Sequence, residues 1–430
     1  MTVGLVSLGC AKNAADLEVR VGRLISEGWT LASDPDHCDA LVVNTCAFIA
    51  SARDEAEREI RRALTLKRKG FVKRVIVAGC YPERYPERAA MFPGVDAWEG
   101  VPKKFDCQRV PGLRLSGKAF AYLKIAEGCA HHCAYCAIPA IRGGYRSRPI
   151  RAILKEARDF VRTGVKELNI IAQDPMLYGV DLKPSPLNPH LSTPNSRTST
   201  SNLQTPNLVT LLKALDHLRG DFKVRVLYSY PSEISDEFLD WMRKSPRAVK
   251  YVDVPLQHTD PAILKAMARG GAVKATQAAA ERIRAAVPGV TLRTTLMTGF
   301  PGETPAAFQR MLDDVKRMRF DHLGVFAYSP EEGTAAAKMK GRPPAKVAEA
   351  RALKVMAAQK RIWEKKARAM LDRTFPALVV APGVARLESQ APDVDGVVRM
   401  DVAASTPFVG AFTTVRLVAV RGYDFIGELT

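Results

Sequence analysis

The chain has 430 residues, of which 47% are hydrophobic, and its formal net charge is +19. This apolar content is ample for packed cores, and the length predicts two to four domains. No run approaches the roughly 18 apolar residues of a membrane-spanning helix, so we expect no such helix. The charge favours a polyanionic neighbour such as RNA or the ribosome, although a basic enzyme without a nucleic-acid role also fits.

Residues 1–100 alternate short apolar runs with helical stretches, which predicts a parallel α/β domain. The runs VGLVSLGC, ALVVNTC and RVIVAGC end in Cys10, Cys46 and Cys80, with helices expected over 14–27 and 51–66. Because ligands bind at the carboxyl ends of parallel strands, we expect these three thiols to converge into one soft-metal site. The alternative is three buried structural cysteines, since free cysteine packs as a small hydrophobe.

A second set of three cysteines follows the strand AYLKIAEG, within the run GCAHHCAYCAIP. Cys129, Cys133 and Cys136 have the spacing Cys-x3-Cys-x2-Cys. An iron–sulfur cube held by four thiolates is saturated, whereas three thiolates leave one iron open to a substrate or cosubstrate. Zinc is the alternative, but His131 and His132 lie between the cysteines, where a closed tetrahedral site is hard to form. Cys38 and Cys107 lack either context, and we predict them to be structural.

Strands and amphipathic helices alternate beyond the cysteine loop, which predicts an open, partial (β/α)6 barrel; a complete barrel would need eight repeats. The cysteine loop follows the first strand, at the end of the barrel where catalytic residues lie. The other strands are expected at 167–174, 223–231, 251–258, 291–300 and 320–330, and the helices at 150–163, 207–218, 234–244, 274–287 and 304–318.

Residues 184–206 break this pattern, because they are rich in Ser, Thr, Pro and Asn and carry one charge, Arg197. Such a composition cannot bury enough apolar surface to offset its ordering entropy, so we predict a disordered surface insertion. A tolerated loop is favoured over a regulatory element.

The C-terminal part changes character again. A long helical stretch is expected over 343–371, and short strands separated by Gly and Pro follow from Phe375, which predicts a small β-barrel or OB-like module that grips RNA or a protein partner. Its aromatic side chains are expected in the core, with stacking on bases as the alternative. These aromatic residues are Phe375, Phe408, Phe412, Tyr423 and Phe425. The expected domains are therefore 1–110, 111–345, a connecting helix over 346–371, and 372–430.

With these residues assembled, the chain resembles the methylthiotransferases of the radical S-adenosylmethionine (SAM) superfamily over nearly its whole length. The motifs that carry the resemblance are VSLGCAKNAADLE, NTCAFIASA, AYLKIAEGCAHHCAYCAIPAIRGGYRSRPI, IAQDPMLYGVDL, VDVPLQH, LKAMARG, RTTLMTGFPGET and FAYSPEEGT. The resemblance implies an N-terminal methylthiotransferase domain, a radical SAM partial barrel and a C-terminal TRAM domain. It implies two 4Fe-4S clusters: an auxiliary cluster on Cys10, Cys46 and Cys80, and a SAM-binding cluster on the catalytic Cys129, Cys133 and Cys136.

The radical SAM resemblance also suggests which residues contact SAM. Tyr135 precedes the third cysteine of the loop and is a candidate to pack against the adenine, and the GFPGET run can bring its backbone close because glycine lacks a Cβ. Polar residues at strand ends are candidates to bind the ribose, the amino-acid moiety of SAM or the substrate, and the alternative is that they are ordinary polar residues of loops. The full candidate set is Tyr135, Gln173, Gln257, Gly299, Gly302 and Glu303, with Asp174 and His258 beside it.

The closest likeness is to the RimO-type branch, which puts a methylthio group on the β-carbon of an aspartate in protein twelve of the small ribosomal subunit. In this family one SAM methylates a sulfur held at the auxiliary cluster, and a second gives the radical that opens the substrate C–H bond. LGCAKN, CAFI and AQDPMLYG favour this branch over the tRNA-adenosine branch, which shares both cysteine sets. A non-catalytic iron–sulfur RNA-binding protein would explain the thiolates, but not the open coordination site or the glycine-rich loop.

The expected partners are ribosomal protein twelve, free or on the ribosome, RNA, and an electron donor such as flavodoxin or ferredoxin, with no membrane. Reduced thiolates at two cluster sites need a reducing compartment, so we expect the cytoplasm. The chain departs from the family pattern by its long stretch at 184–206 and by small residues around the cysteine loop, and neither departure touches a cluster ligand.

Overall fold

The computed structural model describes residues 1–430 except 104–113, 116, 184, 187–202, 205 and 402–406. Cys107 and most of the insertion at 184–206 therefore lie outside the described residues. The chain divides into two compact units. The first comprises 1–117, 127–144 and 329–339, and the second comprises 118–126, 145–328 and 340–430. The cysteine loop thus belongs to the same compact unit as the N-terminal sheet.

The first unit is built on a parallel five-stranded sheet in the order β2-β1-β3-β4-β5, as predicted from the alternating pattern. Its strands are β1 (Thr2–Ser7), β2 (Thr30–Leu31), β3 (Cys38–Thr45), β4 (Val72–Gly79) and β5 (Ala97–Glu99). Its helices are α1 (Ala11–Ser26), α2 (Ala50–Arg68), α3 (Cys80–Arg84) and α4 (Ile138–Arg142), together with the 3-10 helix η1 (Pro86–Met91).

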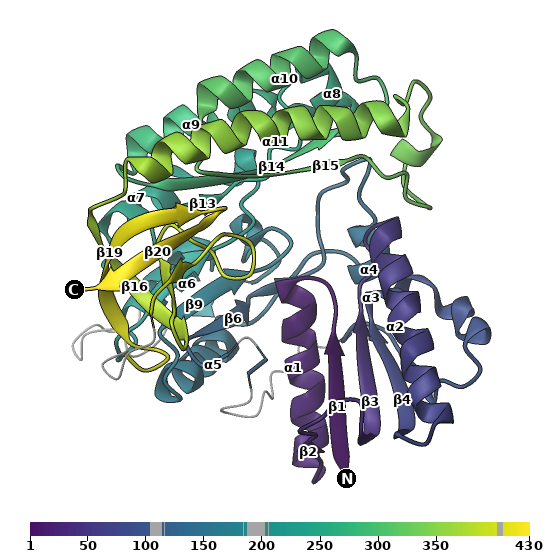
Figure 1. Cartoon of the computed structure of the whole chain (residues 1–430). Coiled ribbons are helices and arrows are strands. Elements are labelled where there is room, and N and C mark those ends of the chain that lie inside the picture. Colours follow the sequence, from purple (N-terminus) through teal and green to yellow (C-terminus); the bar gives the residue numbers. More distant parts are fainter. Residues whose placement is uncertain (104–113, 116, 184, 187–202, 205, 402–406) are drawn as a thin grey trace. The chain divides into compact units, whose positions relative to one another are not determined.

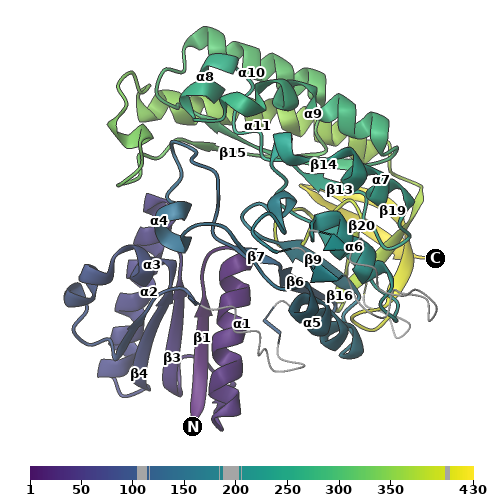
Figure 2. The same ribbon diagram turned by 180° about the vertical axis from the view of Figure 1, so that it is seen from behind.

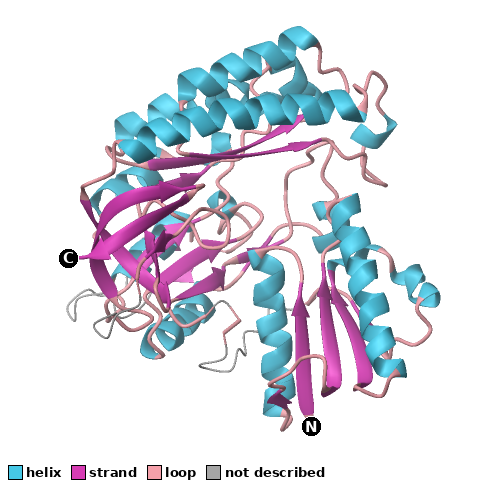
Figure 3. Cartoon of the chain, in the orientation of Figure 1, coloured by secondary structure: helices cyan, strands magenta, loops and turns pink. Residues whose placement is uncertain are grey.

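Successive side chains of β3 lie on opposite faces of this sheet. Ala40 and Val42 pack in a core that includes Leu17 of α1, whereas Leu41 packs in a core that includes Ile60 of α2. Both faces are apolar because parallel sheets are covered on both sides by their crossover helices. Figure 3 shows helices on either side of these strands.

The second unit contains the predicted open, partial barrel of six parallel strands, called the half-barrel below, with the strands arranged as β6-β9-β12 and β13-β14-β15. The strands are β6 (Phe120–Lys124), β9 (Glu167–Ile171), β12 (Lys223–Val226), β13 (Tyr251–Asp253), β14 (Thr291–Thr298) and β15 (His322–Ala327). The helices are α5 (Ile150–Arg162), α6 (Leu208–Asp216), α7 (Asp236–Lys244), α8 (Pro261–Ala266), α9 (Val273–Ala286) and α10 (Pro305–Met318). One large core, made mostly of Leu, Ile and Val with several Ala, Phe and Met side chains, packs the strands against α5, α6, α7, α9 and α10.

The long helix α11 (Ala345–Arg368) packs along α10 and covers β14 and β15 (Figures 1 and 2). After it the chain forms a closed barrel in the order β16-β17-β18-β20-β19, which confirms the predicted small β-barrel. Its strands are β16 (Thr374–Ala381), β17 (Val384–Leu387), β18 (Val398–Arg399), β19 (Phe412–Arg421) and β20 (Asp424–Leu429).

Two details of the β-barrel differ from expectation. The sequence analysis missed β17, whose four residues VARL carry no alternating pattern long enough to mark a strand. The aromatic side chains are also not uniformly core: Phe425 is buried, but Phe408, Phe412 and Tyr423 are 77%, 40% and 44% exposed. Small barrels have little interior volume, so only part of their aromatic surface can be enclosed.

No helix among the described residues is both long and apolar enough to cross a membrane.

Candidate functional site

The first set of cysteines lies at the carboxyl edge of the N-terminal sheet. Cys10 follows β1 and occupies the position just before α1, Cys46 follows β3, and Cys80 follows β4 as the first residue of α3. The three strands are neighbours in the sheet, so their ends meet at one edge. Cys10 is exposed, Cys46 is half-buried and Cys80 is buried. The structure therefore brings together the residues that the strand pattern predicted to converge.

Two glycines let the backbone turn sharply into this edge. Gly9 and Gly79 precede Cys10 and Cys80 and have φ of +94° and +97°, the left-handed region that favours glycine. A Cβ on Gly9 would lie 2.9 Å from Cβ of Cys46, and one on Gly79 would lie 2.7 Å from the carbonyl oxygen of Thr45. Side chains at either position would push the strand ends apart, which explains the repeated Gly-Cys pair.

The thiols of this set influence one another. Burial raises the pKa of Cys46, and the nearby Cys10 raises it further. Burial likewise raises the pKa of Cys80 to about 12; Arg142 opposes this shift, and Cys46 and Cys10 add to it. Three thiols that repel one another as anions need a cation to stay deprotonated together, and metal binding supplies one while it releases the protons. The donor chemistry therefore fits an iron–sulfur cluster.

The second set of cysteines lies on a tight loop whose backbone points hydrogen-bond donors at sulfur. The His131 N–H lies 3.4 Å from Sγ of Cys129, and the Ile138 N–H lies 3.5 Å from Sγ of Cys136. The loop is closed by the Cys136 N–H, which donates to the carbonyl of Cys133 at 3.0 Å. Hydrogen bonds to cysteine sulfurs are among the features by which proteins tune iron–sulfur clusters. The loop geometry thus fits the predicted second cluster.

A distant segment of the chain holds this loop within the first unit. The Ala336 N–H donates to the carbonyl of Ala134 at 2.8 Å. Five residues earlier, the buried Glu331 accepts from the Ala50 N–H at 2.9 Å and from Arg84 at 3.2 Å, and it also pairs with Arg53. The FAYSPEEGT motif therefore has a structural role, which the sequence analysis did not assign.

Among the described residues, no three His, Cys, Asp or Glu side chains are arranged as a site for a single metal ion. A four-iron cluster places each thiolate on a different iron atom, so its ligands need not converge on one point. The spacing of these thiols is therefore compatible with a four-iron cluster.

The sequence analysis missed Arg142, the last residue of α4, whose side chain is 1% exposed. Its Nη1 donates to Asp16 and to Glu127, each at 2.9 Å, and its Nη2 donates to Sγ of Cys80 at 3.4 Å. The available signal was an arginine at the end of IPAIR, a short apolar helix that directly follows the cysteine loop.

The predicted SAM-contacting residues of the second unit lie at the carboxyl ends of its strands. Gln173 follows β9 and is half-buried. Gln257 is 9% exposed and has φ of +69°, and its Oε1 has no hydrogen-bond partner among the described residues. A buried polar atom without a partner, on a strained backbone, is typical of a binding site. Tyr135 lies in the first unit and is half-buried.

Glu303 of the GFPGET loop is buried and holds the loop together. It accepts a hydrogen bond from Arg351 Nη1 at 2.9 Å and another from the Gly299 N–H. His258 Nε2 lies 3.4 Å from its Oε1. Burial raises the pKa of Glu303, but the bonds from His258, Gly299 and Arg351 outweigh burial and hold it below its ordinary value. The carboxylate therefore shapes the loop, and the backbone around Gly299 and Gly302 is what the loop can present to a ligand.

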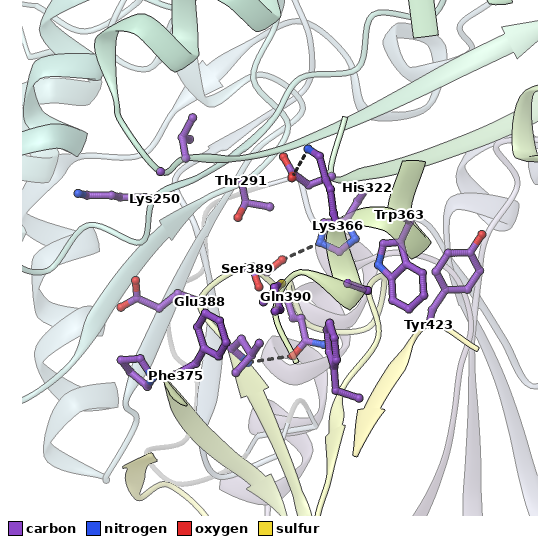
Figure 4. Close-up of a pocket in the computed structure, with 18 of the residues that line it drawn as sticks. Lys250, Thr291, His322, Trp363, Lys366, Phe375, Glu388, Ser389, Gln390 and Tyr423 are labelled. Atoms are coloured by element: carbon purple, nitrogen blue, oxygen red, sulfur yellow. Dashed lines mark hydrogen bonds and ion pairs between the residues drawn. The ribbon is translucent and has the colours of Figure 1, made fainter. Parts of the chain in front are cut away.

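A cavity of about 600 Å³ lies at the opposite edge of the half-barrel (Figure 4). Thr291 and His322, which begin β14 and β15, line it together with the aromatic side chains of Trp363, Phe375 and Tyr423. Its size suits a small ligand. It lies at the amino ends of the strands, however, so it is not the predicted SAM site.

Family models match three stretches of the chain. The model of the Radical SAM superfamily matches residues 123–315, that of the uncharacterized protein family UPF0004 matches 2–100, and that of the TRAM domain matches 365–430.

Curated relatives match the chain over its whole length. Ribosomal protein uS12 methylthiotransferase RimO of Opitutus terrae is 38% identical over 99% of this chain and 96% of that protein. The protein of the same name from Syntrophus aciditrophicus is 38% identical over 100% of this chain and 98% of its own length. The chain belongs to the RimO family of radical SAM methylthiotransferases. This confirms the predicted family and the predicted class of enzyme.

Solved structures support the fold. The radical SAM methyltransferase TsrM from Kitasatospora setae, solved with cobalamin and a [4Fe-4S] cluster bound, has a TM-score of 0.55 and 16% sequence identity. The likeness covers 78% of this chain and 76% of that chain. At this identity it shows a shared fold alone.

Proposed function

We propose that this chain transfers a methylthio group to ribosomal protein uS12, at the β-carbon of an aspartate. The observation that carries this proposal is the full-length match, at 38% identity, to proteins named for that activity. The two cysteine sets within one compact unit support it, because the reaction needs both a sulfur to transfer and a means to open a C–H bond.

We assign Cys10, Cys46 and Cys80 to an auxiliary 4Fe-4S cluster, and Cys129, Cys133 and Cys136 to the cluster that binds SAM. With both clusters bound, one would supply the electron that cleaves SAM and the other would carry the sulfur for transfer. In the net reaction a substrate C–H bond is replaced by a C–S bond, one SAM gives its methyl group to the sulfur, and another SAM yields the group that takes the hydrogen.

The chain's own residues would bind and orient SAM and the substrate, and they would exclude water from the site. Gln257 would offer its unpartnered Oε1 to SAM, and Gln173 follows β9 at the same, carboxyl end of the parallel strands. The Glu303 network would keep the GFPGET backbone in place beside the cofactor. Tyr135 of the cysteine loop is the candidate within the first unit to pack against the adenine.

The proposed setting is the cytoplasm, where the ribosomal protein is made and thiols stay reduced. We propose RNA contact through the C-terminal barrel, because exposed aromatic side chains and a net charge of +19 suit a substrate embedded in RNA. A small electron-transfer protein such as flavodoxin or ferredoxin would supply the electrons.

Mass spectrometry tests the proposal directly. Reconstituted protein would be given SAM and a reductant, together with uS12 in one reaction and tRNA in another. We expect a methylthio mass gain on one aspartate of uS12. A gain on a tRNA adenosine would overturn the substrate and keep the chemistry, and a gain on neither, with SAM left uncleaved, would favour a non-catalytic iron–sulfur protein.

A further inference from the structure

Arg142 connects the two cysteine sets of the first unit. It ends α4, which begins two residues after Cys136, and its Nη2 donates to Sγ of Cys80 at 3.4 Å. The helix is anchored by Ala137 and Ile141, which pack into the same buried core as Cys80. The segment that contains the second cysteine set therefore also places a charged hydrogen-bond donor next to a sulfur of the first set.

The guanidinium is held so that it cannot turn away from this sulfur. Its Nη1 is engaged by Asp16 at 2.9 Å and by both carboxylate oxygens of Glu127, at 2.9 and 3.1 Å. A guanidinium stays protonated in proteins, and these two carboxylates also compensate the burial of its charge. Arg142 is therefore a fixed cation, and its planar fork leaves Nη2 directed at Cys80.

A structural ion pair alone does not account for this geometry. Two carboxylates already compensate one buried cation, which is sufficient for a buried salt bridge. The contact with Cys80 is additional. A charged donor directed at a sulfur withdraws negative charge from it, and iron–sulfur clusters respond to hydrogen bonds at their sulfurs and to net charge by a change in reduction potential.

We propose that Arg142 is a positioning residue that donates to the Cys80 thiolate and raises the reduction potential of the auxiliary cluster. The inference rests on the proposed function, because it needs a cluster on Cys10, Cys46 and Cys80. It goes beyond that function because it names a residue, next to the loop of the SAM-binding cluster, that sets the reduction potential of the auxiliary cluster.

The test isolates the auxiliary cluster. In a parent variant Cys129, Cys133 and Cys136 are replaced by Ala, and the cluster that remains is measured by iron content and by a redox titration followed by electron paramagnetic resonance. Arg142→Gln and Arg142→Lys are then added to this parent. Arg225→Lys is the matched control, because Arg225 is also a buried arginine in an ion pair, with Glu167, and lies in the other compact unit.

We expect Arg142→Gln to shift the midpoint potential to more negative values, since it removes the cation and changes the donor. Arg142→Lys keeps the charge but loses the fork, so its shift has the same sign and is smaller. Arg225→Lys leaves the potential unchanged.

An unchanged midpoint in both Arg142 variants, even with a lower melting temperature, would show that Arg142 is only structural and overturn the inference. If Arg142→Gln does not fold, the Lys variant decides by the same criterion. If the parent binds no iron, the auxiliary site of the proposed function is wrong, and this inference falls with it.

Discussion

At the scale of single residues, the two cysteine sets are expected to fail in different ways. On the proposed assignment, replacing Cys133 with Ala removes one of the three thiolate ligands of the SAM-binding cluster, so cleavage of SAM to deoxyadenosine should fall to background. Cys46→Ala leaves that loop intact, so SAM cleavage should continue while methylthio transfer is lost. Chromatography of the SAM products and mass spectrometry of uS12 check the two results. Methylthio product from Cys46→Ala would remove the auxiliary role from this residue.

The glycine before Cys80 provides a second prediction. Gly79→Ala places a Cβ 2.7 Å from the carbonyl of Thr45 at a φ of +97°, so it should lower both the melting temperature and the iron content at this edge. Gly70 is the control, because its φ is +79° but a Cβ there meets nothing within 4 Å. Its cost is that of the backbone conformation alone, about 1–2 kcal/mol. Equal losses in the two variants would show that crowding at the cysteine edge is unimportant.

Sequence reasoning singled out residues whose role is indicated by their immediate neighbours in the chain. It missed residues whose partners lie far away in the sequence. The sequence placed six cysteines in two sets because each of them lies beside a recognisable local feature, either a strand end or another cysteine. Arg142 has no such feature, since its partner Asp16 lies 126 positions away. Glu331 was missed for the same reason: its partner Arg53 is 278 positions away. Buried charges are recognised by their partners, and only the folded chain brings those together.

At the scale of elements, hydrophobic periodicity predicted the long elements well. The helices expected over 150–163 and 304–318 are observed as Ile150–Arg162 and Pro305–Met318. Long amphipathic helices carry the strongest periodic signal. The four-residue β17 has too few alternations to be recognised, and nothing in the sequence of α4 indicates that it packs against the N-terminal sheet.

The insertion at 184–206 yields a prediction at this scale. Short strands β10 (Ser185–Pro186) and β11 (Leu203–Gln204) pair antiparallel, with Ser185 opposite Gln204, so the two ends of the insertion lie side by side. Replacing 187–202 with an Asn-Gly turn should therefore close a short hairpin without strain on the half-barrel. We expect methylthio transfer at nearly the parental rate, measured by mass spectrometry of uS12. A large loss of product with normal SAM cleavage would instead assign the insertion a role in substrate binding.

At the scale of whole domains, the C-terminal barrel is fixed to the half-barrel by buried charges of the second unit. Glu167, the first residue of β9, accepts from Arg225 of β12 at 3.1 and 3.2 Å and from Arg386 of β17 at 3.0 Å. Nearby, Asp395 accepts from Tyr251 at 2.7 Å and from Arg293 at 2.6 Å. Removing one partner from such a network leaves an uncompensated buried charge, which typically costs about 3–5 kcal/mol. This attachment should therefore depend strongly on the ionisation of its carboxylates.

The Glu167 network predicts how the stability of this unit depends on pH. Burial raises the pKa of Glu167, but Arg225 and Arg386 outweigh burial and lower it from 4.5 to about 2. A carboxylate with a lowered folded-state pKa contributes its full stability above about pH 4.5, and the contribution is lost as the pH falls towards 2. Calorimetric melting between pH 7 and pH 2 should show this loss in the parent. Glu167→Gln should melt lower at pH 7 and depend less on pH.

The exposed pair of Asp236 and Arg282 provides the control for this experiment, because Asp236 is 92% exposed. Exposed pairs contribute about 0–1 kcal/mol, so Asp236→Asn should reproduce the parental melting curve at every pH. If Glu167→Gln instead followed the same pH profile as the parent, carboxylates other than Glu167 would control the acid sensitivity. That result would contradict the assignment of the acid-sensitive attachment of the C-terminal barrel to the Glu167 network.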